Sequence, residues 1–204
     1  GAAGPHPGAA RRALVVGLFD AILGRRKPVG PNLDALFALP SAAITLQVSL
    51  DQLPTGRGAV AFRAPEGRAF ADVEDEVRRL LDADGGPPVE VAADEFGFTW
   101  LVVTTTPADL ASVVTDLHAV NTSLVEAGFG PQLLCSHASF TGPDHASLAM
   151  VYLYKRGTFY PFAPAGAQQR DNVLELRVRD LLAGELPLEA DLSRWFAIWG
   201  APGL

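Results

Sequence analysis

The chain has 204 residues, a single cysteine and a net charge of −7 at pH 7. This length suits one domain, and no apolar run reaches the roughly 20 residues of a membrane-spanning helix. A lone Cys135 excludes an internal disulfide and predicts a reducing, cytoplasmic location. Residues 1–27 carry five basic residues and one acidic residue, which leaves −11 on the rest. So negative a charge would repel the phosphate backbone, which argues against nucleic-acid binding.

The N-terminal part divides into two regions. Residues 1–16 have no helical or strand periodicity and are expected to be disordered or a non-native extension. Residues 17–40 predict two short helices, over 17–24 and 32–39, with Pro40 ending the second. The first helix either docks on the core or lies on an anionic membrane surface. Its apolar arc and the basic run after it consist of Leu18, Phe19, Ile22 and Leu23, and of Arg25, Arg26 and Lys27.

Residues 41–204 predict a single α+β domain. The pattern is two strands followed by a helix, three times, which favours an antiparallel sheet with helices packed on one face. In the first unit, apolar residues alternate over 44–50, a second strand covers 58–63, and a helix covers about 69–83.

The second and third units have clearer boundaries. Strands are expected near 88–93 and 97–105, followed by a helix that Thr106 caps and Gly128 ends. Strands near 132–140 and 147–155 and a helix over 171–183 form the third unit. Asp171 is expected to cap that helix, and Glu175 to pair with Arg179 one turn later.

Sequence motifs for nucleotide binding, for serine hydrolases and for zinc proteases are lacking. Cys135 and His137 share one face of a predicted strand. They form either a nucleophile with its base or two metal ligands, or else they are a buried thiol and a sheet histidine. The interpretation as a buried thiol and a sheet histidine is favoured, because free cysteines are commonly buried. We therefore assign no catalytic residue, no metal and no cofactor.

A possible ligand pocket is indicated on the second predicted helix. Asn121 lies on its apolar arc and His118 at the edge of that arc. A polar side chain that faces the core must find hydrogen-bond partners. The two residues therefore either line a pocket or are satisfied within the core, and the second alternative is favoured.

The segment 152–162 combines aromatic and basic residues around Gly157. Tyrosine and arginine are typical anchors of protein interfaces, so this segment is a candidate partner-binding surface. The alternative is ordinary core packing with solvated charges. The proposed contact residues are Tyr152, Tyr154, Lys155, Arg156, Phe159 and Tyr160.

Several stretches together resemble a known family. They are 17–25 (GLFDAILGR), 31–40 (PNLDALFALP), 115–124 (TDLHAVNTSL), 128–135 (GFGPQLLC), 151–162 (VYLYKRGTFYPF) and 199–204 (WGAPGL). The chain resembles the actinobacterial PspA-associated family PspAB over residues 17–204. That resemblance implies an accessory factor of the phage-shock response to envelope stress, with a PspA-like partner. It implies no established catalytic residue.

From these observations we expect a non-enzymatic adaptor that is cytoplasmic, either free or peripheral to the inner face of the membrane. Two alternatives remain: a small-ligand or lipid-binding module with Asn121 and His118 in its pocket, and an enzyme that uses Cys135 and His137.

Overall fold

The computed structural model describes residues 31–64, 70–83, 85, 88–105 and 109–204. Residues 17–24 and the basic run after them lie outside this part of the chain. The helices are η1 (Leu33–Ala38, 3-10), α2 (Leu39–Leu50), α3 (Phe70–Ala83), α4 (Leu110–Glu126) and α5 (Asn172–Leu182). Short 3-10 turns are η2 (Gly130–Gln132), η3 (Pro143–His145) and η4 (Leu192–Arg194). The strands are β1 (Leu53–Phe62), β2 (Glu90–Ala93), β3 (Thr99–Thr104), β4 (Leu133–Thr141), β5 (Ser147–Leu153) and β6 (Thr158–Phe162).

The strands form one six-stranded antiparallel sheet in the order β2-β3-β1-β4-β5-β6. The predicted α+β class with an antiparallel sheet is confirmed. The three repeated units are not, because the first unit supplies only one strand, β1, which lies inside the sheet. The segment after Gly157 supplies a further strand, β6, that the sequence pattern did not predict.

The residues 44–50 were predicted to be a strand and instead complete helix α2. Leu39, Ala42, Ala43, Leu46 and Leu50 are its buried residues, at the spacing of one helical face. Ile44 and Val48, which alternation would place beside Leu46, are 64% and 80% exposed. Leu46 and Leu50 fit both periods, so the alternation was ambiguous, and burial on the sheet selects the helix.

The helix η1 and α2 together form an apolar run, Leu33–Leu50. By length and composition alone this run could cross a membrane, with a mean hydropathy of 1.5 over 18 residues. Its inner face, however, belongs to the core of the domain. Pro40 does not end the predicted helix, because it occupies the first turn of α2, where proline is tolerated.

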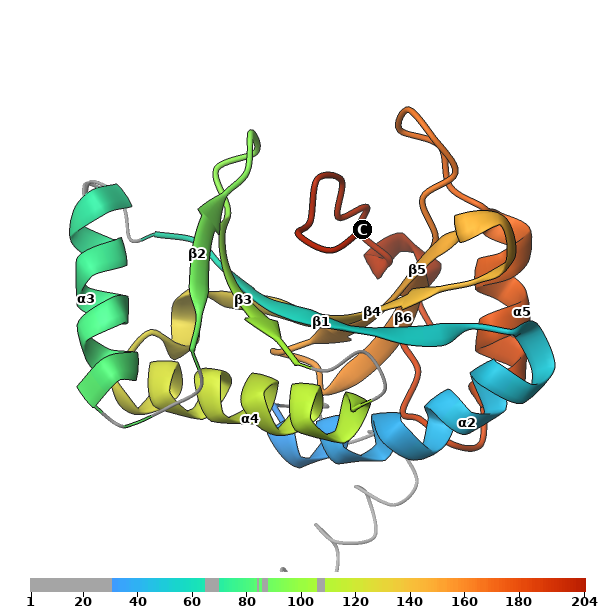
Figure 1. Ribbon diagram of the computed structural model, residues 1–204, viewed down its shortest axis with the longest axis horizontal. Coiled ribbons are helices and arrows are strands. Elements are labelled where there is room, and N and C mark those ends of the chain that lie inside the picture. Colours follow the sequence, from blue (N-terminus) through green and yellow to red (C-terminus); the bar gives the residue numbers. More distant parts are fainter. Residues whose placement is uncertain (1–30, 65–69, 84, 86–87, 106–108) are drawn as a thin grey trace, which may run out of the picture.

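The two faces of the sheet are covered differently. Helices α2 and α4 lie along one face, and the C-terminal segment lies against the other (Figure 1). The helix-side core takes Val60 and Phe62 from β1, whereas the opposite core takes Ala59 and Ala61 from the same strand. This alternation follows from the two-residue period of a strand. The C-terminal segment, residues 195–204, closes the second core with Trp195, Ile198 and Ala201.

Side-chain hydrogen bonds fix the ends of two helices. Asp109, and not Thr106, is the N-cap of α4, and its carboxylate accepts from the Ser112 N–H at 2.9 Å. Thr106 itself lies outside the described residues. Asp171 caps α5 as predicted, accepting from the Leu174 N–H.

The expected pair between Glu175 and Arg179 is wrong. Glu175 is buried, where it accepts hydrogen bonds from Arg170 and from the Ala163 N–H. Arg179 pairs with Asp180 instead. A buried carboxylate requires such partners, which an exposed helical pair would not supply.

Candidate functional site

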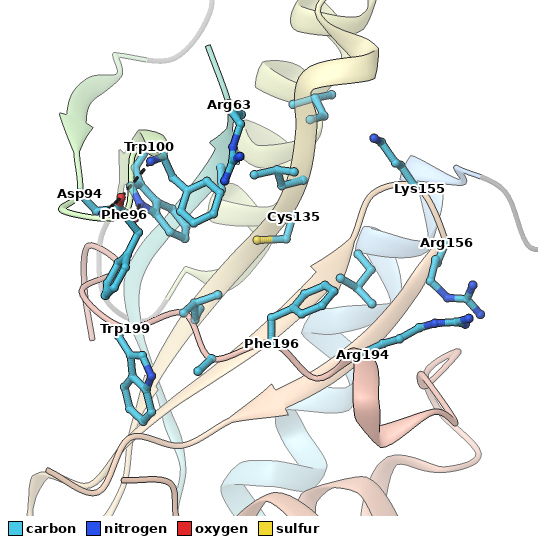
Figure 2. Close-up of a pocket in the computed structure, with 17 residues that line it drawn as sticks. Arg63, Asp94, Phe96, Trp100, Cys135, Lys155, Arg156, Arg194, Phe196 and Trp199 are labelled. Atoms are coloured by element: carbon cyan, nitrogen blue, oxygen red, sulfur yellow. Dashed lines mark hydrogen bonds between the residues drawn. The ribbon is translucent and has the colours of Figure 1, made fainter. Parts of the chain in front are cut away.

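A half-open cavity of about 790 Å³ lies on the sheet face opposite α2 and α4, beside the C-terminal segment (Figure 2). Its volume is within the range of about 300–1,000 Å³ that is typical of small-molecule sites. Strands β1, β3, β4 and β5 form its floor, the β2–β3 turn forms one wall, and residues 196–199 form another.

The floor is a single row of side chains across four neighbouring strands. Ala61 pairs with Trp100 on one side and with Cys135 on the other, and Cys135 pairs in turn with Leu153. All four are buried and belong to the same apolar core. The small side chain of Ala61, between the larger neighbours, leaves room above the centre of the row.

The wall from the β2–β3 turn is held by Asp94. One carboxylate oxygen accepts from the N–H groups of Phe96 and Phe98, both at 2.9 Å, and the other from the Trp100 indole at 2.8 Å. Aspartate is favoured in such turns because its carboxylate can accept from the backbone a few residues onward. Asp94 therefore orients three aromatic residues around the cavity, with Phe96 45% exposed at its mouth.

The C-terminal wall is fastened by contacts to the last strand and to Arg170, which precedes α5. Tyr160 stacks on Trp195, with ring centroids 6.0 Å apart, and its hydroxyl donates to the Phe196 carbonyl at 3.0 Å. Arg170 donates to the Trp195 carbonyl at 2.6 Å. These bonds hold residues 196–199 over the sheet, where Phe196 is 58% exposed and faces the cavity (Figure 2).

Four cations stand around the mouth: Arg63, Lys155, Arg156 and Arg194. Arg156 pairs with the buried Glu189, and Arg194 lies 3.9 Å from Glu189 and 3.5 Å from Asp191. Burial alone would raise the pKa of Glu189, but hydrogen bonds from Arg156, the Asp191 N–H and Thr158 outweigh it and lower that pKa.

The other two cations are available for a ligand. Within the described ranges, no carboxylate pairs with Arg63 or Lys155. Both side chains are exposed, and the Arg63 guanidinium lies 4.9 Å from the centre of the Phe98 ring. The mouth therefore carries free positive charge on a chain whose net charge is negative.

Cys135 and His137 are both buried, as the favoured interpretation expected. Burial raises the pKa of the Cys135 thiol to about 12, so the thiol is protonated at neutral pH and a poor nucleophile. Burial, and next Arg57, lower the pKa of His137 to about 4. Among the residues that the structure describes, no group of three or more His, Cys, Asp or Glu side chains could hold a metal ion.

Comparison with known proteins gives one result. The family model described as PspA associated protein B matches residues 16–203. The chain belongs to the PspAB family. No curated protein and no solved structure shows significant similarity to this PspAB chain.

The proposed partner surface of this PspAB chain is largely wrong. Tyr152, Tyr154 and Phe159 are buried on the helix side of the sheet, and Tyr160 is buried on the other side. The Tyr152 hydroxyl accepts from the Asn32 N–H at 3.2 Å, which ties η1 to the sheet. Only Lys155 and Arg156 of the predicted set reach the surface, and both border the cavity. The cause is that the aromatic side chains belong to β5 and β6 and to the turn between them, not to a loop.

The predicted pocket residues do not line the cavity either. Asn121 is fully buried on the opposite side of the sheet, where its amide donates to the Leu117 carbonyl and to Ser136 Oγ, both at 2.8 Å. His118 lies against Phe37 and 3.3 Å from Asp34. The amide nitrogen of Asn121 is therefore satisfied within the core, as the favoured alternative expected, whereas its Oδ1 is buried without a hydrogen-bond partner among the described residues.

Sequence reasoning missed the aromatic wall. Phe96, Phe98 and Trp100 follow each other within five residues, and Phe196 and Trp199 within four. Those two aromatic clusters were the available signal. Nothing in the sequence indicated that they meet across one cavity, because the contact joins segments about 100 residues apart.

Proposed function

We propose that this protein is a non-enzymatic accessory protein of the bacterial phage-shock response, and that it acts in the cytoplasm by binding a PspA-like protein. The family description associates the chain with PspA. The observation that carries the binding role is the cavity, with its apolar floor, its exposed aromatic side chains at the mouth and the cations Arg63 and Lys155, for which the described residues supply no carboxylate partner. A mostly apolar cavity with a few polar groups at its mouth is the usual composition of a binding site.

The mouth of the cavity is the proposed contact with the partner. Phe96 and Phe196 are exposed aromatic side chains, and a large exposed aromatic residue is a common anchor of protein interfaces. Lys155 and Arg156, which the sequence analysis also proposed as contact residues, belong to this proposed surface because both border the same mouth. The aromatic anchors come from other segments than the tyrosines first considered.

The test uses the purified chain and the purified PspA-like protein of the same genome. Phe196→Asp is expected to weaken binding by roughly ten-fold or more, the loss that truncating an interface anchor produces. Val48→Asp is the matched control, because Val48 is equally apolar and 80% exposed but lies on α2, across the sheet. Equal affinities of the two variants and the wild type would rule out the mouth as the contact.

Contact with the membrane is a separate part of the proposal. The basic and apolar residues of 17–27 are the proposed attachment, by their composition. Liposomes that contain anionic lipid should carry the full chain upward in a flotation assay, and a chain without residues 17–27 should stay behind. Flotation of both forms, or of neither, would reject attachment through this segment.

A small-ligand-binding module is the second candidate function. The cavity supports it directly, because it is recessed and its volume matches that of a small-molecule site. The residues first considered for that role, Asn121 and His118, are elsewhere in the fold.

A further inference from the structure

The floor of the cavity cannot satisfy a polar ligand. Trp100, Ala61, Cys135 and Leu153 are apolar or weakly polar, and the Trp100 indole N–H is already bonded to Asp94. All four floor strands have a neighbour on both sides, so their backbone groups pair within the sheet. A peptide that entered the floor would bring N–H and C=O groups that find no partner there. An alkyl chain brings none.

The charges of the mouth are distributed unevenly. Lys155, Arg156 and Arg194 stand on one side of the cavity, whereas Phe96 and Trp199 stand on the other, with Cys135 between them (Figure 2). Glu189 and Asp191 form ion pairs with Arg156 and Arg194 and so partly neutralise the charge of the two arginines. Among the described residues, Lys155 is the cation on that side for which no carboxylate partner is found. The opposite end is aromatic and carries one cation, Arg63, whose guanidinium packs against the Phe98 ring at 4.9 Å. A mainly aromatic end and a more cationic end fit a ligand with an alkyl chain and a single anionic head.

We infer that the cavity binds one single-chain anionic amphiphile, whose alkyl chain lies over the row from Trp100 to Leu153 and whose head group meets Lys155. The inference rests on the proposed function only in that the cavity is a binding site; it does not require the PspA-like partner. A fatty-acid carboxylate and a lysophospholipid phosphate share this chemistry. The volume of about 790 Å³ accommodates a single ligand of this kind.

Two of the three tryptophans line the cavity, so they report on its occupant. The probe is ω-bromododecanoate, whose bromine quenches indole fluorescence at short range. We expect saturable quenching of the full chain below the micelle concentration, and weaker quenching in Trp199→Phe. Unbrominated octanoate, decanoate and dodecanoate compete, and their affinity should rise by about four-fold per buried methylene until the cavity is full.

Two variants separate the head from the chain. Lys155→Glu should weaken dodecanoate binding by roughly 3- to 10-fold, and added salt should shrink the difference. Arg177→Glu is the matched control: it also reverses an exposed cation, on α5, outside the cavity. Cys135→Phe fills the floor and should abolish binding, while Cys135→Ser should retain it. Circular dichroism checks folding, and Lys155→Glu tests the inference if the Phe variant does not fold.

The results that overturn the inference are distinct. If the protein bound dodecanol and dodecanoate with equal affinity, the anionic head group would not be recognised. If Lys155→Glu and Arg177→Glu had equal effects, the head group would not bind at Lys155. Quenching by brominated phosphatidylglycerol vesicles, with none by monomeric bromododecanoate or lysophosphatidylglycerol, would make the site a membrane surface. The higher affinity for either bromododecanoate or lysophosphatidylglycerol identifies the head group as a carboxylate or a phosphate. Capture of the PspA-like protein without any quenching would overturn the amphiphile and leave the proposed function standing.

Discussion

Acidification should destabilise this protein through His137. The imidazole is 1% exposed, and its ring meets Trp100 edge-on with the ring centroids 5.6 Å apart. Its Nε2 has no hydrogen-bond partner within the part of the chain that the structure describes. Burial, and next Arg57, lower its pKa from 6.5 to about 4. Below pH 6.5 the unfolded chain therefore binds a proton that the folded chain refuses. Stability falls as the pH falls from 6.5 to about 4, by about 2 kcal/mol at pH 5 and roughly 3 kcal/mol at the lower limit.

The assay compares urea unfolding at pH 7 and pH 5, followed by tryptophan fluorescence. His137→Leu removes the imidazole, so its free energy of unfolding should change less with pH than that of the wild type, by about 2 kcal/mol. The difference between the two proteins excludes the contribution of the carboxylates to the pH dependence, because both proteins contain the same carboxylates. His145→Gln, at an exposed turn, controls for loss of a histidine. Parallel pH dependences of the wild type and His137→Leu would refute the reasoning.

Two substitutions and one reactivity assay test the packing of the fold. Gly58→Ala should cost about 1–3 kcal/mol in urea unfolding, because its Cβ would lie 2.9 Å from the His137 carbonyl oxygen; Gly184→Ala, in open space, should be neutral. Glu189→Gln should cost about 1–3 kcal/mol at pH 7, since Arg156 loses its buried partner, and the difference from the wild type should shrink as the pH falls. Cys135 should react slowly with a thiol reagent at pH 8 and quickly in urea, and a fast native reaction would contradict its raised pKa.

The strongest periodic patterns predicted local structure well. The helix α4 carries its buried leucines and valines at helical spacing, and the strands β3 and β5 were expected where they lie. The segment 39–50 shows the limit of this reasoning. A stretch whose apolar residues fit both the strand and the helical period is decided by what it packs against, and here Ala42 and Ala43 are buried in the helix-side core.

The prediction of a partner-binding surface over residues 152–162 was wrong for a related reason. Aromatic residues near a glycine and two cations are typical both of an interface and of a hairpin inside a sheet. Tyr152 and Phe159 pair across β5 and β6, with rings 5.2 Å apart in the helix-side core. Exposure is a property of the assembled layers, so composition alone could not separate the two cases.

The sequence by itself determined the α+β class, the resemblance to the PspAB family and the expectation that Cys135 and His137 are inert, because these depend on short-range periodicity, motif identity and residue type. Only the tertiary structure decided where the site lies. The cavity exists because an antiparallel register places Trp100, Ala61, Cys135 and Leu153 in one row, and because the C-terminal segment returns across that row. Both contacts join residues far apart in the chain, and local sequence patterns do not show which distant segments meet.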